Sequence, residues 1–265
     1  MRLIHPLARV GVRLFSYLGV NPLHLVVTHG LLGLIAAWLI AKEPPGLLLA
    51  ALLLQVKTLL DNIDGGLARA TGQVTQMGRY LDTGIDLIVN FVLFLALSRY
   101  GPLGPAMVAF LILTVLLSFD FNLERLHKRA FSDRADQTSG RAQDPEPIGA
   151  PRSLFFLFRG IYLLLLAPQD RLIERLELWR FRRLSGQSYL DADPVQKRAW
   201  SDLFSTASVV NLGLSTQLFV LGVFLVVGRP YGYVYAIFFQ GGYFLWVQLL
   251  RTDRFRRTLR GGDRP

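Results

Sequence analysis

Six apolar runs, each long enough to cross a bilayer, constrain the fold of this chain more than any other feature. A helix needs about 20 mainly apolar residues to span the hydrocarbon core. Runs of this kind lie at residues 23–42, 46–69, 75–98, 103–122, 205–227 and 230–250. Several connections between them are short and rich in Pro or Gly, which favours antiparallel neighbours. We therefore predict an all-α membrane protein, a bundle of six transmembrane helices.

The two ends of the chain lie outside the predicted bundle. Residues 1–22 place Arg2, Arg9 and Arg13 among apolar side chains. This pattern is typical of an amphipathic helix that lies on the membrane surface. Residues 251–265 are rich in arginine and are predicted to form a basic tail.

A basic insert at residues 123–204 separates the fourth and fifth predicted spans. Its apolar piece, residues 154–167, is interrupted by Arg159 and Gly160 and is too short for a confident span. We interpret this piece as interfacial or re-entrant. The run at 170–184 alternates acidic and basic residues at helical spacing, which indicates a helix facing water or headgroups.

Charge placement predicts the orientation of the bundle. The chain has a formal net charge of +10 and a pI near 10.3, and its basic residues flank the apolar runs. We therefore expect an anionic membrane surface as the partner and no nucleic acid. The short connections on one side carry only Lys42, Arg99 and Arg229, so the positive-inside rule places both termini and the insert in the cytoplasm. The bias of Arg over Lys favours a bacterial cytoplasmic membrane. The absence of cysteine excludes disulfides and thiolate chemistry.

One stretch between the second and third spans gathers acidic residues. Residues 61–86 read DNIDGGLARATGQVTQMGRYLDTGID. Four aspartates stand there at helical spacing: Asp61, Asp64, Asp82 and Asp86. Residues three or four apart lie on one helix face, so the first pair shares a face and the second pair shares another. Because the linking loop is short, we expect the four carboxylates to converge on one pocket.

Such a cluster needs a cation, since ionisable groups near the bilayer are costly and like charges repel. Oxygen ligands suit a hard ion such as Mg²⁺, Mn²⁺ or Ca²⁺. Four carboxylates suffice for a pair of ions, and metal pairs commonly serve displacement at phosphorus. Gly65 and Gly78 let a phosphate approach the backbone, and Arg69 offers a forked donor for phosphate oxygens.

The complete pattern is D-x-x-D-G-x-x-A-R, eight residues, then G-x-x-x-D-x-x-x-D. It resembles the signature of the CDP-alcohol phosphotransferase (phosphatidyltransferase) family. All eight fixed positions are filled, by Asp61, Asp64, Gly65, Ala68, Arg69, Gly78, Asp82 and Asp86. The resemblance implies two divalent cations, Mg²⁺ or Mn²⁺, held by the four aspartates, with Asp86 also acting as the base. It implies that Gly65, Ala68, Arg69 and Gly78 line the site for the CDP moiety.

The resemblance implies transfer of a phosphatidyl group from CDP-diacylglycerol to a polar alcohol, with release of CMP. The alternative within the family is transfer of a phospho-headgroup from a small CDP-alcohol to diacylglycerol or a polyol phosphate. Family members are often dimers, so a homodimer is also implied. A transporter-like bundle would likewise place carboxylates in the membrane, but the motif and the lack of broken helices in matched halves argue against it.

Weaker signals surround the motif. Lys57 lies one turn before Asp61 and either contacts a substrate phosphate or pairs with Asp61 or another helix. Asn90 lies one turn beyond Asp86 and either extends the pocket or bonds another helix. Three polar residues of the fifth span share a face and either meet the alcohol or hold helices together: Ser208, Asn211 and Ser215.

Two departures from the family pattern bear on specificity. The first span often begins Pro-Asn-x-x-Thr in the family, but Leu23 and Val26 occupy those places here. Thr28 and His29 of this span are therefore assigned no role. Members that make phosphatidylglycerophosphate or phosphatidylinositol phosphate often have a basic residue after the final aspartate. Leu87 stands there in this chain, which argues against those substrates.

Overall fold

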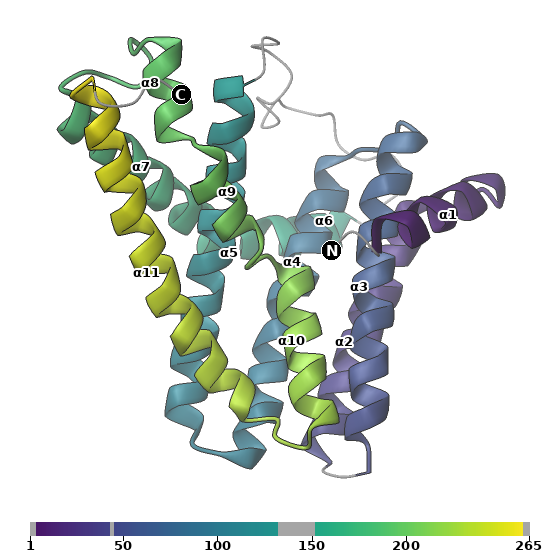
Figure 1. Cartoon of the computed structure of the whole chain (residues 1–265). Helices are drawn as coiled ribbons and strands as arrows, with labels where there is room; N and C mark the ends of the chain where they lie inside the picture. The colour runs from purple at the N-terminus through teal and green to yellow at the C-terminus, as the bar shows by residue number, and fades with distance from the viewer. Residues whose placement is uncertain (1–3, 43–44, 132–151, 262–265) are drawn as a thin grey trace. The chain divides into compact units, whose positions relative to one another are not determined.

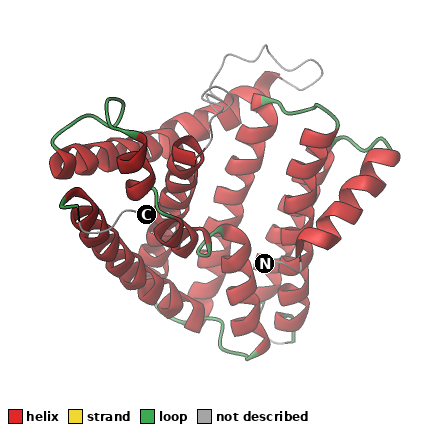
Figure 2. Cartoon of the chain, turned by 45° about the horizontal axis from the view of Figure 1, so that its top comes forward, coloured by secondary structure: helices red, strands yellow, loops and turns green. Residues whose placement is uncertain are grey.

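The computed structural model describes residues 4–42, 45–131 and 152–261, and these residues are almost entirely helical (Figure 1). No strand occurs among them (Figure 2), so the all-α prediction is confirmed. The helices in chain order are α1 (Ile4–Tyr17), α2 (Pro22–Ala41), α3 (Leu47–Ala70), α4 (Gln76–Leu97), the short η1 (Ser98–Tyr100), α5 (Leu103–Phe131), α6 (Arg152–Ile161), the π-helical η2 (Tyr162–Leu166), α7 (Ala167–Ser185), α8 (Pro194–Trp200), α9 (Leu203–Val210), α10 (Leu214–Val226) and α11 (Gly232–Leu259).

Five segments of the described chain are long and apolar enough to cross a membrane, judged by length and composition alone. They are Pro22–Ala41, Met77–Tyr100, Leu103–Phe131, Pro194–Val226 and Gly232–Leu259. The predicted second span, 46–69, corresponds to α3, which is 24 residues long but is not among the five. Four charged residues interrupt it from its middle onward: Lys57, Asp61, Asp64 and Arg69. The six-span bundle therefore stays a prediction, as does the surface location of α1.

Several helix boundaries differ from the predicted spans. Helices α5 and α11 are 29 and 28 residues long and continue past the apolar runs that end at 122 and 250. Arg, Lys and Glu are good helix formers, so leaving the apolar run does not end the helix. The predicted span 205–227 is not one helix, because a turn at 211–213 separates α9 from α10. Broken helices are common in transporters, so this break removes helix continuity as an argument against a transporter. The enzyme prediction therefore rests on the motif.

The insert is mostly helical where the structure describes it, with a loop at residues 186–193 between α7 and α8. The apolar piece 154–167 lies in α6, η2 and the start of α7, and its interfacial or re-entrant position stays a prediction. The helix predicted at 170–184 is confirmed as part of α7, but it does not face water or headgroups all round, because Asp170, Ile173, Glu177 and Phe181 are buried. Gly186 ends this helix with a φ of 78°, a left-handed conformation that glycine adopts without strain. Part of the insert, residues 132–151, lies outside the described residues.

The chain divides into two compact units. Within the first unit, α2 packs along both α3 and α4, while α3 also contacts α1 and α10, and α4 contacts α6 (Figure 1). Glycines allow α2 and α4 to approach closely: a Cβ at Gly30 would lie 2.5 Å from Ile85 Cγ2, and one at Gly33 would lie 2.5 Å from Val89 Cγ1. The face of α2 between these glycines is therefore pressed against α4.

The second unit has an apolar core formed by α5, α7, α8 and α11, with Phe181, Trp200 and Phe255 at its centre. The three rings pack together, with Trp200 and Phe255 centroids 5.0 Å apart. An ion pair joins Arg251 on α11 to Glu177 on α7 within this core, and both side chains are almost fully buried. The helices α7 and α8 of the insert therefore share one core with α11 and the second part of α5.

Candidate metal centre

Three of the four predicted carboxylates come together in the first unit, and a histidine lies among them. Asp61 and Asp64 come from α3, Asp82 comes from α4, and His29 comes from α2. Each offers a ligand atom, and these atoms all lie within 4.8 Å of one another. The structure therefore supports the predicted convergence for three of the four carboxylates. Helix α2 joins the two sides, since it packs against both α3 and α4.

His29 is the best-enclosed member of the cluster. Its Nε2 atom lies 3.0 Å from Asp64 Oδ2, 3.5 Å from Asp82 Oδ1 and 3.9 Å from Asp61 Oδ1. The His29 and Asp64 side chains are 0% and 6% exposed, whereas Asp82 is 38% exposed. The cluster therefore has a closed end at His29 and an accessible end at Asp82.

Several buried atoms of the cluster have no hydrogen-bond partner. They are both ring nitrogens of His29, Asp64 Oδ2 and Asp82 Oδ1. Although His29 Nε2 and Asp64 Oδ2 are 3.0 Å apart, their orientation is not that of a hydrogen bond. Buried polar atoms are rarely left unsatisfied, and an ion is one of the groups that satisfies them. The donor set, three carboxylates and an imidazole, therefore fits a divalent cation.

Asp86, the fourth predicted ligand, makes a different contact. Its Oδ1 lies 2.7 Å from Lys57 Nζ of α3. Lys57 is 1% exposed and Asp86 is 17% exposed, so this ion pair is largely shielded from water. Of the alternatives for Lys57, the structure therefore provides pairing with another helix, through Asp86 of α4 rather than Asp61. Asn90 is buried on α4, one turn beyond Asp86.

The non-acidic motif residues flank the cluster. A Cβ at Gly65 would lie 3.5 Å from Arg69 Nη1, so the Arg69 guanidinium folds back beside Gly65 on α3. Ala68 is half-buried on the same helix. Gly78 lies in the first turn of α4, where its N–H donates to the side chain of Thr75 at 3.0 Å. Their contacts with a CDP moiety stay a prediction.

The polar face predicted on the fifth span is split by the turn at 211–213. Ser208 lies on α9, Asn211 caps its end, and Ser215 lies on α10. Ser215 accepts a 3.4 Å hydrogen bond from Asn62, the residue after Asp61. This contact favours the interpretation of Ser215 as a residue that holds α10 against α3.

His29 is the member of the cluster that sequence reasoning missed. The available signal was an ionisable residue inside an apolar span, which is costly unless it has a function. The comparison with the family pattern drew attention to Leu23 and Val26 instead and gave no role to the residue one turn further on. The Gly30 and Gly33 positions that follow it were a second signal, because small residues mark close helix contacts.

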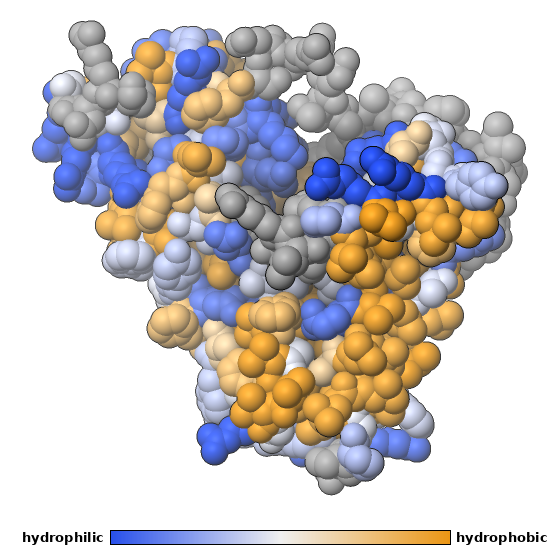
Figure 3. Space-filling model, turned by 45° about the vertical axis from the view of Figure 1, so that its right-hand side comes forward, coloured by the Kyte–Doolittle hydropathy of each residue, from blue (hydrophilic) through white to orange (hydrophobic). Residues whose placement is uncertain are grey.

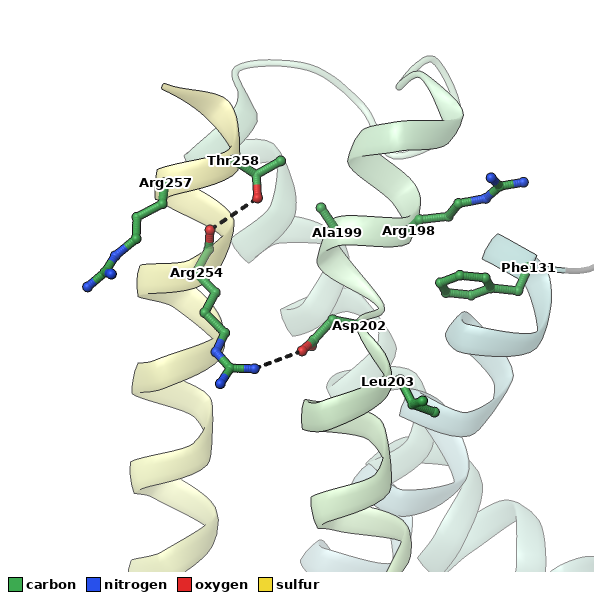
Figure 4. Close-up of a pocket in the computed structure, with 8 residues that line it drawn as sticks. All are labelled: Phe131, Arg198, Ala199, Asp202, Leu203, Arg254, Arg257 and Thr258. Atoms are coloured by element: carbon green, nitrogen blue, oxygen red, sulfur yellow. Dashed lines mark hydrogen bonds and ion pairs between the residues drawn. The ribbon is translucent and has the colours of Figure 1, made fainter. Parts of the chain in front are cut away.

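A pocket in the second unit offers a different arrangement (Figure 4). Arg198, Arg254 and Arg257 line it together with Asp202 and Phe131. Arg254 lies 3.5 Å from Asp202, and the Arg198 guanidinium lies over the Phe131 ring. Arg257 pairs with Asp253 at 2.7 Å. Because its arginines already have protein partners, this pocket is a weaker candidate than the carboxylate cluster.

Comparison with known proteins supports the motif. The family model described as CDP-alcohol phosphatidyltransferase matches residues 20–181. The chain is 35% identical over 96 residues to an archaetidylinositol phosphate synthase of Pyrococcus horikoshii, a region covering 36% of this chain and 50% of that protein.

Two further relatives are named bifunctional IPC transferase and DIPP synthase. The protein from Aquifex aeolicus is 36% identical over 94 residues, which is 35% of this chain and 21% of the relative. The protein from Thermococcus kodakarensis is 37% identical over 98 residues, which is 37% of this chain and 22% of the relative. The chain thus spans half or less of each of these relatives. No solved structure matches the chain.

Proposed function

The chain belongs to the CDP-alcohol phosphatidyltransferase family, and on this basis we propose that it transfers a phosphatidyl group from CDP-diacylglycerol to a polar alcohol, releasing CMP. The observation that carries the proposal is the meeting of Asp61, Asp64 and Asp82 from two helices within 4.8 Å, together with His29. The site lies in a chain rich in apolar helices, where a lipid-linked donor is accessible.

Asp61, Asp64, Asp82 and Asp86 would hold two divalent cations, Mg²⁺ or Mn²⁺. When bound, such ions supply positive charge that stabilises the pyrophosphate and the departing CMP. The unpartnered buried oxygens of Asp64 and Asp82 support this assignment. Asp86 lies one helical turn beyond Asp82 on α4, so it faces the same side of the helix.

The chemical step is a displacement at phosphorus. The acceptor hydroxyl oxygen forms a bond to the β-phosphorus, and the bond from that phosphorus to the bridging oxygen breaks. CMP leaves with the electron pair, and the acceptor proton passes to the Asp86 carboxylate. Lys57, 2.7 Å from Asp86 Oδ1, orients this carboxylate toward the site.

The remaining motif residues would hold the nucleotide end of the donor. Arg69 presents a forked donor beside Gly65, an arrangement suited to phosphate oxygens. Gly65 and Gly78 carry no side chain, and Ala68 carries a small one, so a phosphate or ribose can approach both helices. Exposed Arg69 lies in the last turn of α3, where a bound nucleotide remains accessible to water.

We further propose that α3 crosses the membrane as a sixth span and that α1 lies on its surface. The first half of α3 exposes Leu48, Leu49, Leu52 and Val56, as expected of a lipid-facing helix. Figure 3 shows side chains of this kind, in orange, gathered on the face that it draws. The charge distribution supports a bacterial cytoplasmic membrane, with both termini and the site on the cytoplasmic side.

The acceptor is a polar alcohol whose identity the names of the relatives help to narrow. Archaetidylinositol phosphate synthase is named for a lipid product that carries an inositol phosphate. Leu87, which replaces a basic residue, argues against a phosphorylated acceptor. The first acceptor panel therefore compares two alcohols without a phosphate, free inositol and serine, with two phosphorylated ones, inositol phosphate and glycerol phosphate. Headgroup transfer from a small CDP-alcohol to diacylglycerol or a polyol phosphate is the alternative within the same site, and a homodimer is compatible with both.

The test is CMP release by the purified protein in detergent or lipid, with Mg²⁺ or Mn²⁺ and CDP-diacylglycerol. Release should require an alcohol, and Asp86→Asn should lower it by about 10²–10⁴-fold because the proton acceptor is removed. Asp191→Asn, an exposed carboxylate in the loop after α7, is the matched control and should keep full activity. Turnover of a small CDP-alcohol alone would move the assignment to headgroup transfer. No CMP from any CDP donor would refute the enzyme proposal.

A further inference from the structure

We propose that His29 is a direct metal ligand through Nε2, so that the centre has a mixed nitrogen and oxygen donor set that favours Mn²⁺, or a similar transition ion, over Mg²⁺. The inference rests on the proposed function, which places a divalent ion at the same carboxylates. It adds a ligand from α2, a helix outside the motif, and a preference among metals.

The distances around His29 Nε2 match those between ligands of one ion. An octahedral ion about 2.1 Å from each ligand separates neighbouring ligand atoms by roughly 3.0 Å and opposite ones by roughly 4.2 Å. The three carboxylate oxygens lie 3.0, 3.5 and 3.9 Å from His29 Nε2. All three distances fall inside this interval.

His29 Nε2 faces the three carboxylates, and neither ring nitrogen makes a hydrogen bond within the described chain. The side chain of His29 is 0% exposed. A buried imidazole whose nitrogens make no hydrogen bond is costly, so this side chain and the carboxylates beside it point to a shared cation. Packing fixes the position of the His29 side chain, because Gly30 and Gly33 bring α2 against Ile85 and Val89 of α4.

The chemistry of an imidazole separates the candidate metals. Mg²⁺ prefers oxygen ligands and keeps several waters. Imidazole nitrogen favours transition ions, whose affinities for a nitrogen and oxygen site increase from Mn²⁺ toward Co²⁺ and Cu²⁺. Replacing one oxygen ligand by His29 should therefore increase the affinity for Mn²⁺ relative to Mg²⁺.

The experiment is pulsed electron paramagnetic resonance of Mn²⁺ bound to the full chain in detergent, read for coupling to ¹⁴N of an imidazole. The wild-type chain should show this coupling, and labelling its histidines with ¹⁵N should replace it by the ¹⁵N pattern. His29→Gln should abolish it, because glutamine places an amide oxygen near the former Nε2. His24→Gln is the control, since His24 is exposed on the same helix, and it should keep the coupling.

Titration calorimetry gives the second measurement. Changing a residue that only supports a metal ligand typically costs 10–100-fold in affinity, so loss of the His29 ligand should weaken Mn²⁺ binding by at least about tenfold. Mg²⁺ binding should change less. Mn²⁺ that binds the wild-type chain without nitrogen coupling would overturn the assignment of His29 and leave the carboxylate site and the proposed function intact. Wild-type protein that binds no Mn²⁺ or Mg²⁺ would overturn both.

Discussion

Arg251 is a buried cation whose removal tests the account of the second unit. It is 1% exposed, and its Nη1 lies 2.6 Å from Glu177 Oε2. Its Nε donates to the carbonyl of Trp200 at 2.8 Å, and its guanidinium lies 4.0 Å from the centre of the Trp200 ring. One side chain therefore joins α7, the end of α8 and α11.

Arg251→Met keeps most of the side-chain volume and removes the charge. Breaking a buried ion pair by deleting one partner costs about 3–5 kcal/mol. Glu177 keeps a second partner, since Arg180 Nη1 lies 2.9 Å from its Oε1, so we expect the lower end, about 3 kcal/mol. Each kcal/mol shifts the Tm of a chain of this size by roughly 2–4 °C. The variant should therefore unfold about 6–12 °C below the wild-type chain.

The assay is thermal unfolding in detergent, followed by tryptophan fluorescence because Trp200 lies within the network. Arg257→Met is the control: this arginine forms an exposed pair with Asp253, and such pairs are worth at most about 1 kcal/mol. Arg251→Met together with Glu177→Gln should recover part of the loss, because no buried carboxylate is then left with a reduced set of partners. A Tm for Arg251→Met equal to that of Arg257→Met would refute the structural role of the pair.

Three more predictions concern the first unit. Lys57→Met should destabilise the chain by about 3 kcal/mol and lower CMP release, because Asp86 loses its buried partner; Tm and CMP assays check this. Gly33→Leu should cost about 1–3 kcal/mol and weaken Mn²⁺ binding, because the new side chain meets Val89 and moves α2 away from α4; Tm and calorimetry report both effects. Removing divalent ions with a chelator should stop CMP release and lower Tm, and Mn²⁺ at 100-fold above its Kd should restore about 3 kcal/mol of folding stability, measured as a rise in Tm.

Each of these has its own control. Lys128→Met alters an exposed lysine that pairs with Glu124 and should leave Tm nearly unchanged. Gly242→Leu adds a side chain where a Cβ meets nothing within 4 Å, so it should be tolerated. Equal effects of Gly33→Leu and Gly242→Leu would contradict the close approach of α2 and α4. Full activity after chelation, with metal analysis confirming removal, would contradict the role of the carboxylates as metal ligands.

The motif allowed the site to be predicted where local spacing decides geometry. Asp61 and Asp64 had to share a face of α3, and a short loop had to bring Asp82 near them. The contribution of His29 depends instead on how α2 packs between α3 and α4, which no local spacing specifies. In the same way, the ion pair of Lys57 with Asp86 depends on packing, and sequence reasoning left it as one of two alternatives.

The fold shows a similar limit. Apolar length indicated α2, α3, α4, α5 and α11, but it did not indicate where the helices end. Helices α5 and α11 continue because their charged residues favour helix, and the turn at 211–213 interrupts an apolar run that reads as continuous. Arg251 was predicted to lie in a basic tail, yet it is buried because α7 supplies Glu177 as its partner. Tertiary contacts, which the pattern of hydropathy does not encode, decide these cases.

The place of His29 along α2 has a consequence for the lipid substrate. Helix α2 is 20 residues long, or about 30 Å, the thickness of a hydrocarbon core. His29 comes seven residues after Pro22, which is ~10 Å along the helix axis. If α2 spans the bilayer and the proposed metal centre beside His29 binds the reacting phosphates, they must descend well below the surrounding headgroups, or the leaflet must thin around the protein. Turnover should then vary with the acyl-chain length of the host bilayer, while the affinity for the metal stays constant.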